Sequence, residues 1–147
     1  MIDLKDFPLD ELTEYLKTIG EPKFRSEQIF AWLAKGASPA EMQNLPKDFR
    51  QTLTDAIDWR LPRIAEKYVS GEDGTVKYLL SLNDGECVEC VFMEYHHGNT
   101  LCVSSQAGCR MGCKFCASTL NGRVRNLTPS EILGQVIVAA RDTGKRV

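Results

Sequence analysis

The sequence predicts an α+β protein in three parts: a helical accessory domain over residues 1–60, an antiparallel β-hairpin connector over residues 61–98, and the first βα unit of a partial barrel over residues 99–147. Apolar residues recur at helical spacing up to residue 60, short β-rich runs follow, and a strong helix start lies at residue 128. The composition, with 43% hydrophobic and 26% charged residues, is that of an ordinary globular protein.

Four helices are expected before residue 60. The first ends at Gly20, the second covers residues 24–35, a short third starts at the capping box of residues 38–41, and the fourth follows Pro46. Their expected buried faces consist of apolar residues three or four positions apart: Leu9, Leu12, Leu16, Ile19, Ile29, Phe30, Leu33, Leu45, Phe49, Leu53 and Ile57. These residues alone assign no chemistry to the domain.

Four short strands are expected after residue 60, at Ile64–Val69, Val76–Leu82, Cys87–Tyr95 and Thr100–Ser104. They are rich in β-branched and aromatic residues, and clusters of Gly, Asp and Asn separate them. The turn Asn83-Asp84-Gly85 is short enough for a β-hairpin, so neighbouring strands should pair in antiparallel fashion.

A final helix is predicted by the capping box Thr128-Pro129-Ser130-Glu131, which has proline at the first helical position. It should end near Gly144 and have one apolar face, formed by Ile132, Leu133, Val136, Ile137 and Ala140. A strand, a loop with reactive side chains and a helix are the start of a βα barrel. Because one such unit cannot bury both faces of its strand, we expect the chain to be the N-terminal fragment of a longer protein.

The most informative motif is the C-x3-C-x2-C run of Cys109, Cys113 and Cys116. Three thiolates this close together can hold three irons of a cubane [4Fe-4S] cluster, and the lack of a fourth cysteine in the loop leaves one iron open. An open iron can bind and reductively cleave S-adenosylmethionine (SAM), so the motif indicates radical chemistry. Phe115, between two of the cysteines, is expected to pack against the nucleoside of that ligand.

A zinc site is the main alternative, because Cys87 and Cys90 form a second C-x2-C pair. They lie in an extended, alternating run and should point to opposite faces of a strand, which does not suit one ion. We therefore interpret both as small buried hydrophobic residues.

The expected location is the cytoplasm. The acidic N-terminus lacks the apolar core of a signal peptide, and no apolar run is long enough to span a bilayer, so no membrane association is expected. In that compartment the six cysteines are more typical of ligands or catalysts than of a disulfide framework, which is the alternative.

Charge is unevenly distributed, although the net charge is only -2. Residues 102–147 contain seven Lys and Arg but two Asp and Glu, and the preceding residues are acidic. A positive region around the cysteine motif suits an anionic substrate such as RNA or a nucleotide, although solvated surface charges would give the same pattern.

The segment Thr100-Leu101-Cys102-Val103-Ser104-Ser105-Gln106-Ala107-Gly108-Cys109, the motif that follows it and Arg125-Asn126-Leu127-Thr128 closely resemble the RlmN family of radical-SAM methyltransferases, which act on C2 of adenine in ribosomal RNA. The stretch from Phe24 to Trp32 also resembles the accessory domain of that family. Family members are more than twice as long as this chain. Cluster spacing alone marks the radical-SAM superfamily, whereas the lead-in to the motif is typical of this branch.

The resemblance implies roles for particular residues. Cys109, Cys113 and Cys116 match the cluster ligands. Cys102 matches the cysteine that releases methylated RNA from a covalent adduct, and Glu89 matches a proton acceptor. Physical chemistry supports these roles: a thiol near a basic loop is shifted toward thiolate, and a carboxylate on a largely apolar strand should be desolvated, as suits a general base.

In the reaction that the resemblance implies, a carrier cysteine near the C-terminus is methylated, and its methyl carbon is then joined to adenine C2 as a radical. The implied partners are 23S rRNA, tRNA and an electron donor such as flavodoxin or ferredoxin. The chain lacks the carrier cysteine, so we expect the fragment alone to be inactive. The alternatives are the similar branch that methylates adenine C8, and a non-catalytic zinc- or RNA-binding module.

Overall fold

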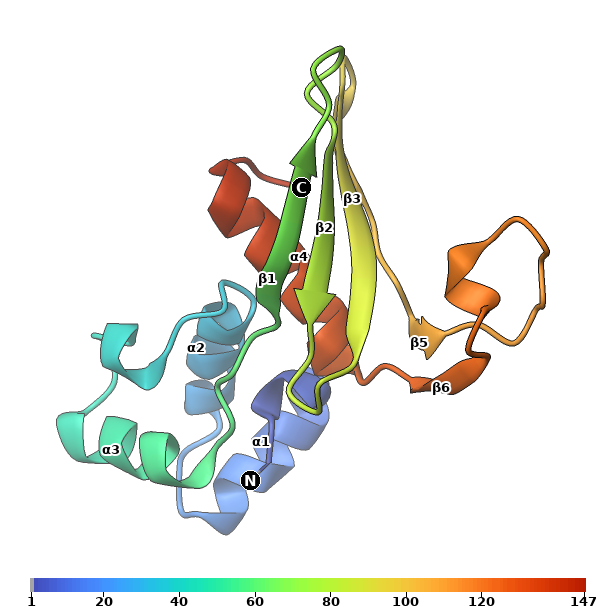
Figure 1. Cartoon of the computed structure of the whole chain (residues 1–147). Helices are drawn as coiled ribbons and strands as arrows, with labels where there is room; N and C mark the ends of the chain where they lie inside the picture. Colours follow the sequence, from blue (N-terminus) through green and yellow to red (C-terminus); the bar gives the residue numbers. More distant parts are fainter. Residues whose placement is uncertain (1) are drawn as a thin grey trace. The chain divides into compact units, whose positions relative to one another are not determined.

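The computed structural model describes residues 2–147 and divides into two compact units, Met1–Arg60 and Leu61–Val147. Within these residues lie four α-helices and an antiparallel β-sheet, which confirms the predicted α+β class (Figure 1). No helix in this range is both long and apolar enough to cross a membrane.

The first unit is helical. Its α-helices are α1 (Leu9–Thr18), α2 (Phe24–Leu33) and α3 (Lys47–Ala56), and it also has two short 3-10 turns, η1 (Leu4–Asp6) and η2 (Pro39–Glu41). The helix predicted from the first capping box is therefore only the single turn η2, although the box itself forms.

The core of the first unit consists of buried apolar side chains, most of them predicted: Leu4, Leu12, Leu16, Ile29, Leu33, Met42, Leu45, Phe49, Leu53 and Ile57. Three residues expected on buried faces, Leu9, Ile19 and Phe30, are instead about 40% exposed. Leu9 and Ile19 lie at the two ends of the short helix α1, and Phe30 is next to Ile29, which takes the buried position.

The second unit begins with a four-stranded antiparallel sheet in the order β1-β2-β3-β4, of which Figure 1 labels the first three strands. The strands are β1 (Arg63–Val69), β2 (Val76–Ser81), β3 (Cys87–Tyr95) and β4 (Gly98–Cys102), each within two residues of its expected bounds. Because successive side chains of a strand point to opposite sides, the sheet has an inner face that packs on a helix and an outer face that does not.

The inner face packs against α4 (Pro129–Thr143), which lies behind the sheet in Figure 1. The buried residues of this core are Val76, Tyr78, Leu80, Leu82, Val88, Cys90, Phe92, Ala107, Leu127 and Ala139. The Tyr78 hydroxyl donates a hydrogen bond of 2.6 Å to the Asp142 carboxylate in the last turn of α4. A polar bond thus ties the helix to the sheet beside the apolar contacts.

Helix α4 starts at its predicted capping box and is ended by Gly144, which has a φ of 67°. Its predicted apolar face is wrong in part, because Ile137 is buried but the other four expected residues are only half-buried: Ile132, Leu133, Val136 and Ala140. The core beneath the sheet is contacted by Ile132, as predicted, and by Val138 and Ala139, which were not predicted. Gln135, a polar residue, is fully buried.

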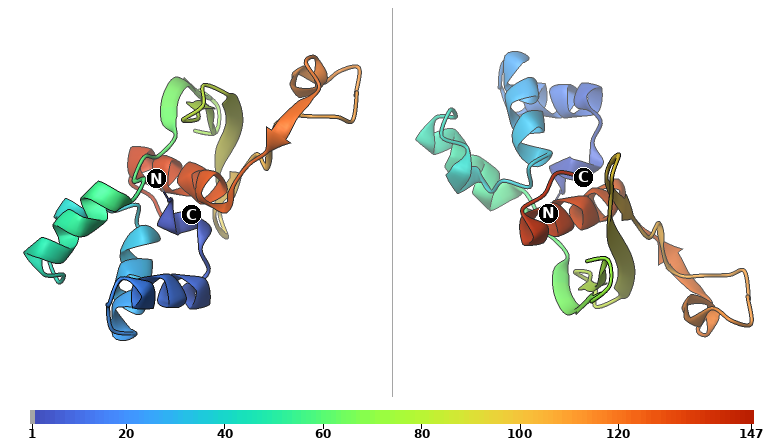
Figure 2. Two further views of the ribbon diagram at one scale, coloured as in Figure 1. Left: turned by 90° about the horizontal axis from the view of Figure 1, so that it is seen from below. Right: turned by 90° about the horizontal axis from the view of Figure 1, so that it is seen from above.

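Between β4 and α4 the chain forms a projecting arm that the sequence pattern did not predict. Strands β5 (Gln106–Gly108) and β6 (Arg123–Asn126) pair in antiparallel fashion, and the 3-10 turn η3 (Ala117–Thr119) lies in the loop between them. Residues 106–126 are called the cysteine arm below. Both views of Figure 2 show it extending away from the four-stranded sheet. The cysteine motif therefore follows a separate ribbon, and not the last strand of the sheet as expected.

Candidate functional site

The loop of the cysteine arm is folded by its backbone and not by its sulfurs. The Cys109 N–H donates to the Gly122 carbonyl (3.0 Å), and the Cys116 N–H donates to the Cys113 carbonyl (3.1 Å). The Thr119 hydroxyl donates to the Cys116 carbonyl (2.9 Å). All three thiols are free of disulfides; Cys113 is exposed and the other two are half-buried. The loop is thus shaped while its sulfurs stay available to a ligand.

Gly108 fixes the place where the ribbon enters this loop. Its φ is +70°, and a Cβ built on it would lie 2.1 Å from the carbonyl oxygen of Gly122. This oxygen is the acceptor for the Cys109 N–H. A residue with a side chain would meet both a disfavoured backbone conformation and a backbone clash, so glycine is required here.

The three thiols have the donor chemistry of an iron–sulfur site, because thiolates are the usual ligands of such clusters. They lie on one short loop and none is consumed by a disulfide. In residues 2–147 no three His, Cys, Asp or Glu side chains converge on a common metal position. The three cysteines fit a cluster by residue type and by their spacing in the sequence, and their role as ligands stays a prediction.

Phe115 is 94% exposed, and two other apolar side chains of the arm, Met111 and Leu120, are 73% and 81% exposed. An exposed aromatic ring between two cysteines is free to stack on a base. The expected contact of Phe115 with a nucleoside stays a prediction.

The sheet brings the two predicted catalytic residues, Glu89 and Cys102, to one face. Val91 of β3 is directly opposite Cys102 of β4, so their side chains share a side of the sheet. Glu89 lies two residues before Val91 on the same strand and points the same way. Glu89 and Cys102, thirteen positions apart in the sequence, are therefore diagonal neighbours on the sheet, within reach of each other's side chains. Both are exposed on the outer face.

The surroundings of Glu89 differ from those expected. Its side chain is 52% exposed, and its carboxylate forms an ion pair of 2.8 Å with Lys77 of β2. The expectation that an apolar strand would desolvate this carboxylate is therefore wrong. The strand's apolar residues occupy the inner face, whereas the outer face at this point is open and charged.

Cys87 and Cys90 lie on opposite sides of β3, as predicted. Cys90 is buried, as expected, and burial raises the pKa of its thiol to about 11, with nearby Cys102 adding to the shift. Cys87 is exposed, so the expectation that it is buried is wrong. While the strand is formed, the two sulfurs cannot bind one ion, which removes the geometric basis of the zinc alternative.

A polar pocket of about 740 Å³ lies between β3 and the cysteine arm. Glu89 lines it from the sheet, and Cys109 lines it from the arm. Its remaining walls are formed by Glu86, Cys87, Val88, Val103, Ser104, Ser105, Gln106, Gly108, Ala117, Ser118, Asn121, Gly122 and Val124. One predicted cluster ligand and the predicted proton acceptor therefore face the same space, whereas Cys113, Cys116 and Phe115 lie outside it.

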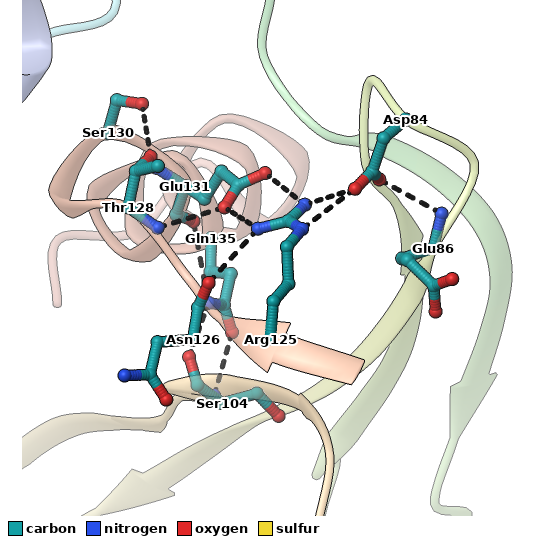
Figure 3. Close-up of polar contacts among 9 residues, drawn as sticks. All are labelled: Asp84, Glu86, Ser104, Arg125, Asn126, Thr128, Ser130, Glu131 and Gln135. Atoms are coloured by element: carbon teal, nitrogen blue, oxygen red, sulfur yellow. Dashed lines mark hydrogen bonds and ion pairs between the residues drawn. The ribbon is translucent and has the colours of Figure 1, made fainter. Parts of the chain in front are cut away.

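At its base the cysteine arm is tied to the sheet and to α4 by Arg125, shown between two carboxylates in Figure 3. The guanidinium donates to both oxygens of Glu131 (2.7 and 2.8 Å) and, through two nitrogens, to Asp84 in the β2–β3 turn (2.8 and 2.6 Å). The hydrogen bond from Arg125 lowers the pKa of Glu131. The arm is thus joined to two elements through a charged, bidentate contact.

The other end of the arm is held by Gln135. This buried amide accepts a hydrogen bond from the Ser104 N–H (2.9 Å) and donates one to the Ser104 carbonyl (2.8 Å). Arg125 and Gln135 both help to build the site, and neither role was predicted from the sequence. A polar residue within an apolar helical pattern was the available indication for Gln135.

Comparisons with known proteins agree along the chain. A family model described as the ribosomal RNA large subunit methyltransferase N-terminal domain matches residues 2–58. A probable dual-specificity RNA methyltransferase RlmN of Lachnoclostridium phytofermentans is 51% identical over 99% of this chain and 42% of its own length. The protein of the same description from Clostridium beijerinckii is 47% identical over 100% of this chain and 42% of its own length.

A solved structure is also similar. The crystal structure of a radical SAM methyltransferase from Sphaerobacter thermophilus matches with a TM-score of 0.88 and 35% identity, covering 100% of this chain and 45% of that one. The chain spans less than half the length of the curated relatives that it matches. Sequence and structure together show that the chain resembles the RlmN family: residues 2–58 match its N-terminal domain, and the whole chain matches less than half the length of its members.

Proposed function

We propose that the chain is the N-terminal part of a radical-SAM methyltransferase that modifies C2 of adenine in 23S rRNA and in tRNA. The observation that carries the proposal is the shared pocket, which Glu89 and Cys109 line from opposite sides, with Cys102 close by on the outer face. The names of the relatives support an RNA substrate, since they describe dual-specificity RNA methyltransferases.

In this proposal Cys109, Cys113 and Cys116 hold a [4Fe-4S] cluster, and Phe115 packs against the nucleoside of SAM. When bound, the cluster and SAM would supply the one-electron chemistry that a non-nucleophilic carbon such as adenine C2 requires. The loop carries the three thiols, and Gly108 permits the close backbone approach that fixes where the loop begins.

Glu89 would receive the proton that leaves adenine C2, and Cys102 would release the methylated RNA from its adduct. Their exposure on the outer face leaves room for an RNA base to approach. Cys90, whose pKa is raised by burial, stays a protonated thiol beneath the face. Among the sheet thiols, Cys102 is accordingly better suited than Cys90 to act as a nucleophile.

RNA would approach from the side of the cysteine arm, where Arg110, Lys114 and Arg123 are exposed. Positive side chains near a site raise the local concentration of a polyanion and are the usual contacts to phosphates. An electron donor such as flavodoxin or ferredoxin completes the proposed system, which we place in the cytoplasm. Residues 1–60, 61–98 and 99–147 would serve as accessory domain, connector and start of the radical-SAM core.

The test is anaerobic reconstitution of the complete protein with iron and sulfide, followed by methylation of 23S rRNA and tRNA with labelled SAM and nucleoside analysis. We expect 2-methyladenosine and a visible absorbance near 400 nm, roughly where Cys-ligated clusters absorb. Product at C8 would assign the protein to the other branch. Colourless protein with bound zinc and no methyl transfer would contradict the proposal. The 147-residue chain alone should transfer no methyl group.

A further inference from the structure

We infer that Lys77 is a positioning residue for Glu89, whose ionised carboxylate it holds on the outer face at the edge of the pocket. The inference rests on the proposed function, because it concerns how the proposed proton acceptor is oriented. No role was predicted for Lys77 from the sequence.

The register of β2 and β3 brings the two side chains together. Leu79 is directly opposite Glu89, and Lys77, two residues earlier, is opposite Val91. Lys77 and Glu89 are thus diagonal neighbours on one face, a separation that long side chains bridge. The Lys77 ammonium lies 2.8 Å from a carboxylate oxygen of Glu89.

A second contact holds Lys77 from the opposite side. Tyr68 of β1 is directly opposite Lys77, and the ammonium lies 5.7 Å from the centre of the tyrosine ring. This is the range of a cation–π contact. The Tyr68 hydroxyl in turn donates a hydrogen bond to Glu66. A row of four side chains therefore crosses three strands and ends at Glu89.

The charge of Lys77 is secure at neutral pH. The hydrogen bond with Glu89 raises the pKa of Lys77, which keeps the ammonium protonated. Other ionisable groups that share the outer face or line the pocket include Glu66, Tyr68, Glu86, Cys87, Cys102 and Cys109. Among the described residues, Lys77 is the cation that forms an ion pair with Glu89.

The pair suits a proton acceptor that must be ready before the substrate arrives. A glutamate side chain has several rotatable bonds, and fixing them in advance removes an entropic cost from the reaction. When Glu89 accepts the proton, the C2–H bond breaks, its electron pair returns to the adenine ring, and an O–H bond forms on the carboxylate. Because both side chains are about half exposed, the proton then leaves to water and the ion pair re-forms.

The experiment compares methyl transfer by the complete enzyme with and without this contact. Lys77→Met keeps the apolar stem and removes the charge, whereas Lys77→Arg keeps the charge. The matched control is Lys145→Met. It removes a similarly exposed ion pair between Lys145 and Glu94, which lies on β3 as Glu89 does. We expect Lys77→Met to lower kcat about tenfold, a modest part of what general bases contribute, with the KM for RNA nearly unchanged. Lys77→Arg should recover most of the rate.

Two further readouts separate positioning from a merely structural effect. In a Glu89→Gln background, Lys77→Met should cause no further loss, because its effect passes through the carboxylate. With RNA deuterated at adenine C2, the isotope effect on kcat should increase in Lys77→Met, since proton removal becomes slower. Additive losses, or an unchanged isotope effect, would overturn the inference.

A measurement on the 147-residue chain keeps this result separate from the proposed function. NMR relaxation of the Glu89 side chain should show greater mobility in Lys77→Met and no change in Lys145→Met. If Glu89 is equally mobile in the wild type and Lys77→Met, Lys77 does not position it, whatever the enzyme does. If the wild-type enzyme transfers no methyl group, the proposed function fails, and the mobility of Glu89 still decides the role of Lys77.

Discussion

Replacing Arg125 by methionine should destabilise the second unit by about 2–3 kcal/mol. The larger share comes from Glu131, because two charged hydrogen bonds of 2.7 and 2.8 Å join side chains that are 30% and 16% exposed. Charged hydrogen bonds of this kind contribute about 1.5–3 kcal/mol. The bond to Asp84, which is 44% exposed, adds about 0.2–1 kcal/mol, as is usual for surface pairs.

Amide hydrogen exchange of β2 and β3 is the suitable assay, because both tryptophans, Trp32 and Trp59, lie in the first unit and would report on that unit instead. The contribution has a pH dependence with a definite sign. Since Arg125 lowers the pKa of Glu131, the stabilisation is complete at neutral pH and is lost as the pH falls below the ordinary glutamate range near 4.5.

Two variants sharpen the Arg125 test. Arg125→Lys keeps the charge but loses the planar fork that contacts both carboxylates, so it should cost about half as much. Arg123→Met removes an exposed arginine from the same strand and should change stability by less than about 0.5 kcal/mol. The reasoning is refuted if Arg125→Met costs less than about 1 kcal/mol, or if Arg123→Met costs as much.

Three other predictions concern the arm, the sheet and the first unit. Gly108→Ala should abolish iron binding after reconstitution, because its Cβ would clash with the Gly122 carbonyl. Gly112 has a similar φ but open space around it, so Gly112→Ala should keep most of the bound iron. Equal iron contents in the two variants would show that the clash does not matter for iron binding. Mass spectrometry after brief alkylation at pH 8 should find Cys90 unmodified and the other thiols modified, since burial keeps its pKa near 11; rapid labelling of Cys90 would show that the strand opens. The hydrogen bond from Arg60 lowers the pKa of Asp58 to about 2. Acidification from pH 4 to 2 should therefore lower the stability of the first unit by up to about 1 kcal/mol, a figure that is reduced because Arg60 is largely exposed. Unfolding followed by tryptophan fluorescence should lose this pH dependence in Asp58→Asn.

Local patterns were sufficient to predict the helices and strands, because capping boxes, turn residues and periodicity act over a few residues. The capping box at Thr128 and the stop at Gly144 place α4 where the structure has it. The alternation along β3 likewise separates Cys87 from Cys90. It does not say which side a helix will cover, and for this reason Cys87 and Glu89 were assigned the wrong surroundings.

The contacts that assemble the site join residues far apart in the chain and have no local pattern. Arg125 and Asp84 are 41 positions apart, and Gln135 is 31 positions from Ser104. Any of several acidic residues would have served equally well as a partner for Arg125 on charge alone. The cysteine spacing identified the motif, whereas the ribbon that carries it depends on the pairing of β5 with β6.

Both roots of the cysteine arm are fastened to a single helix, at Glu131 and Gln135, which lie one turn apart on α4. Because both contacts lie on one helical turn, the two ends of the arm are held by the same short segment of α4. A substitution that displaces this turn of α4 would therefore move both ends of the arm together.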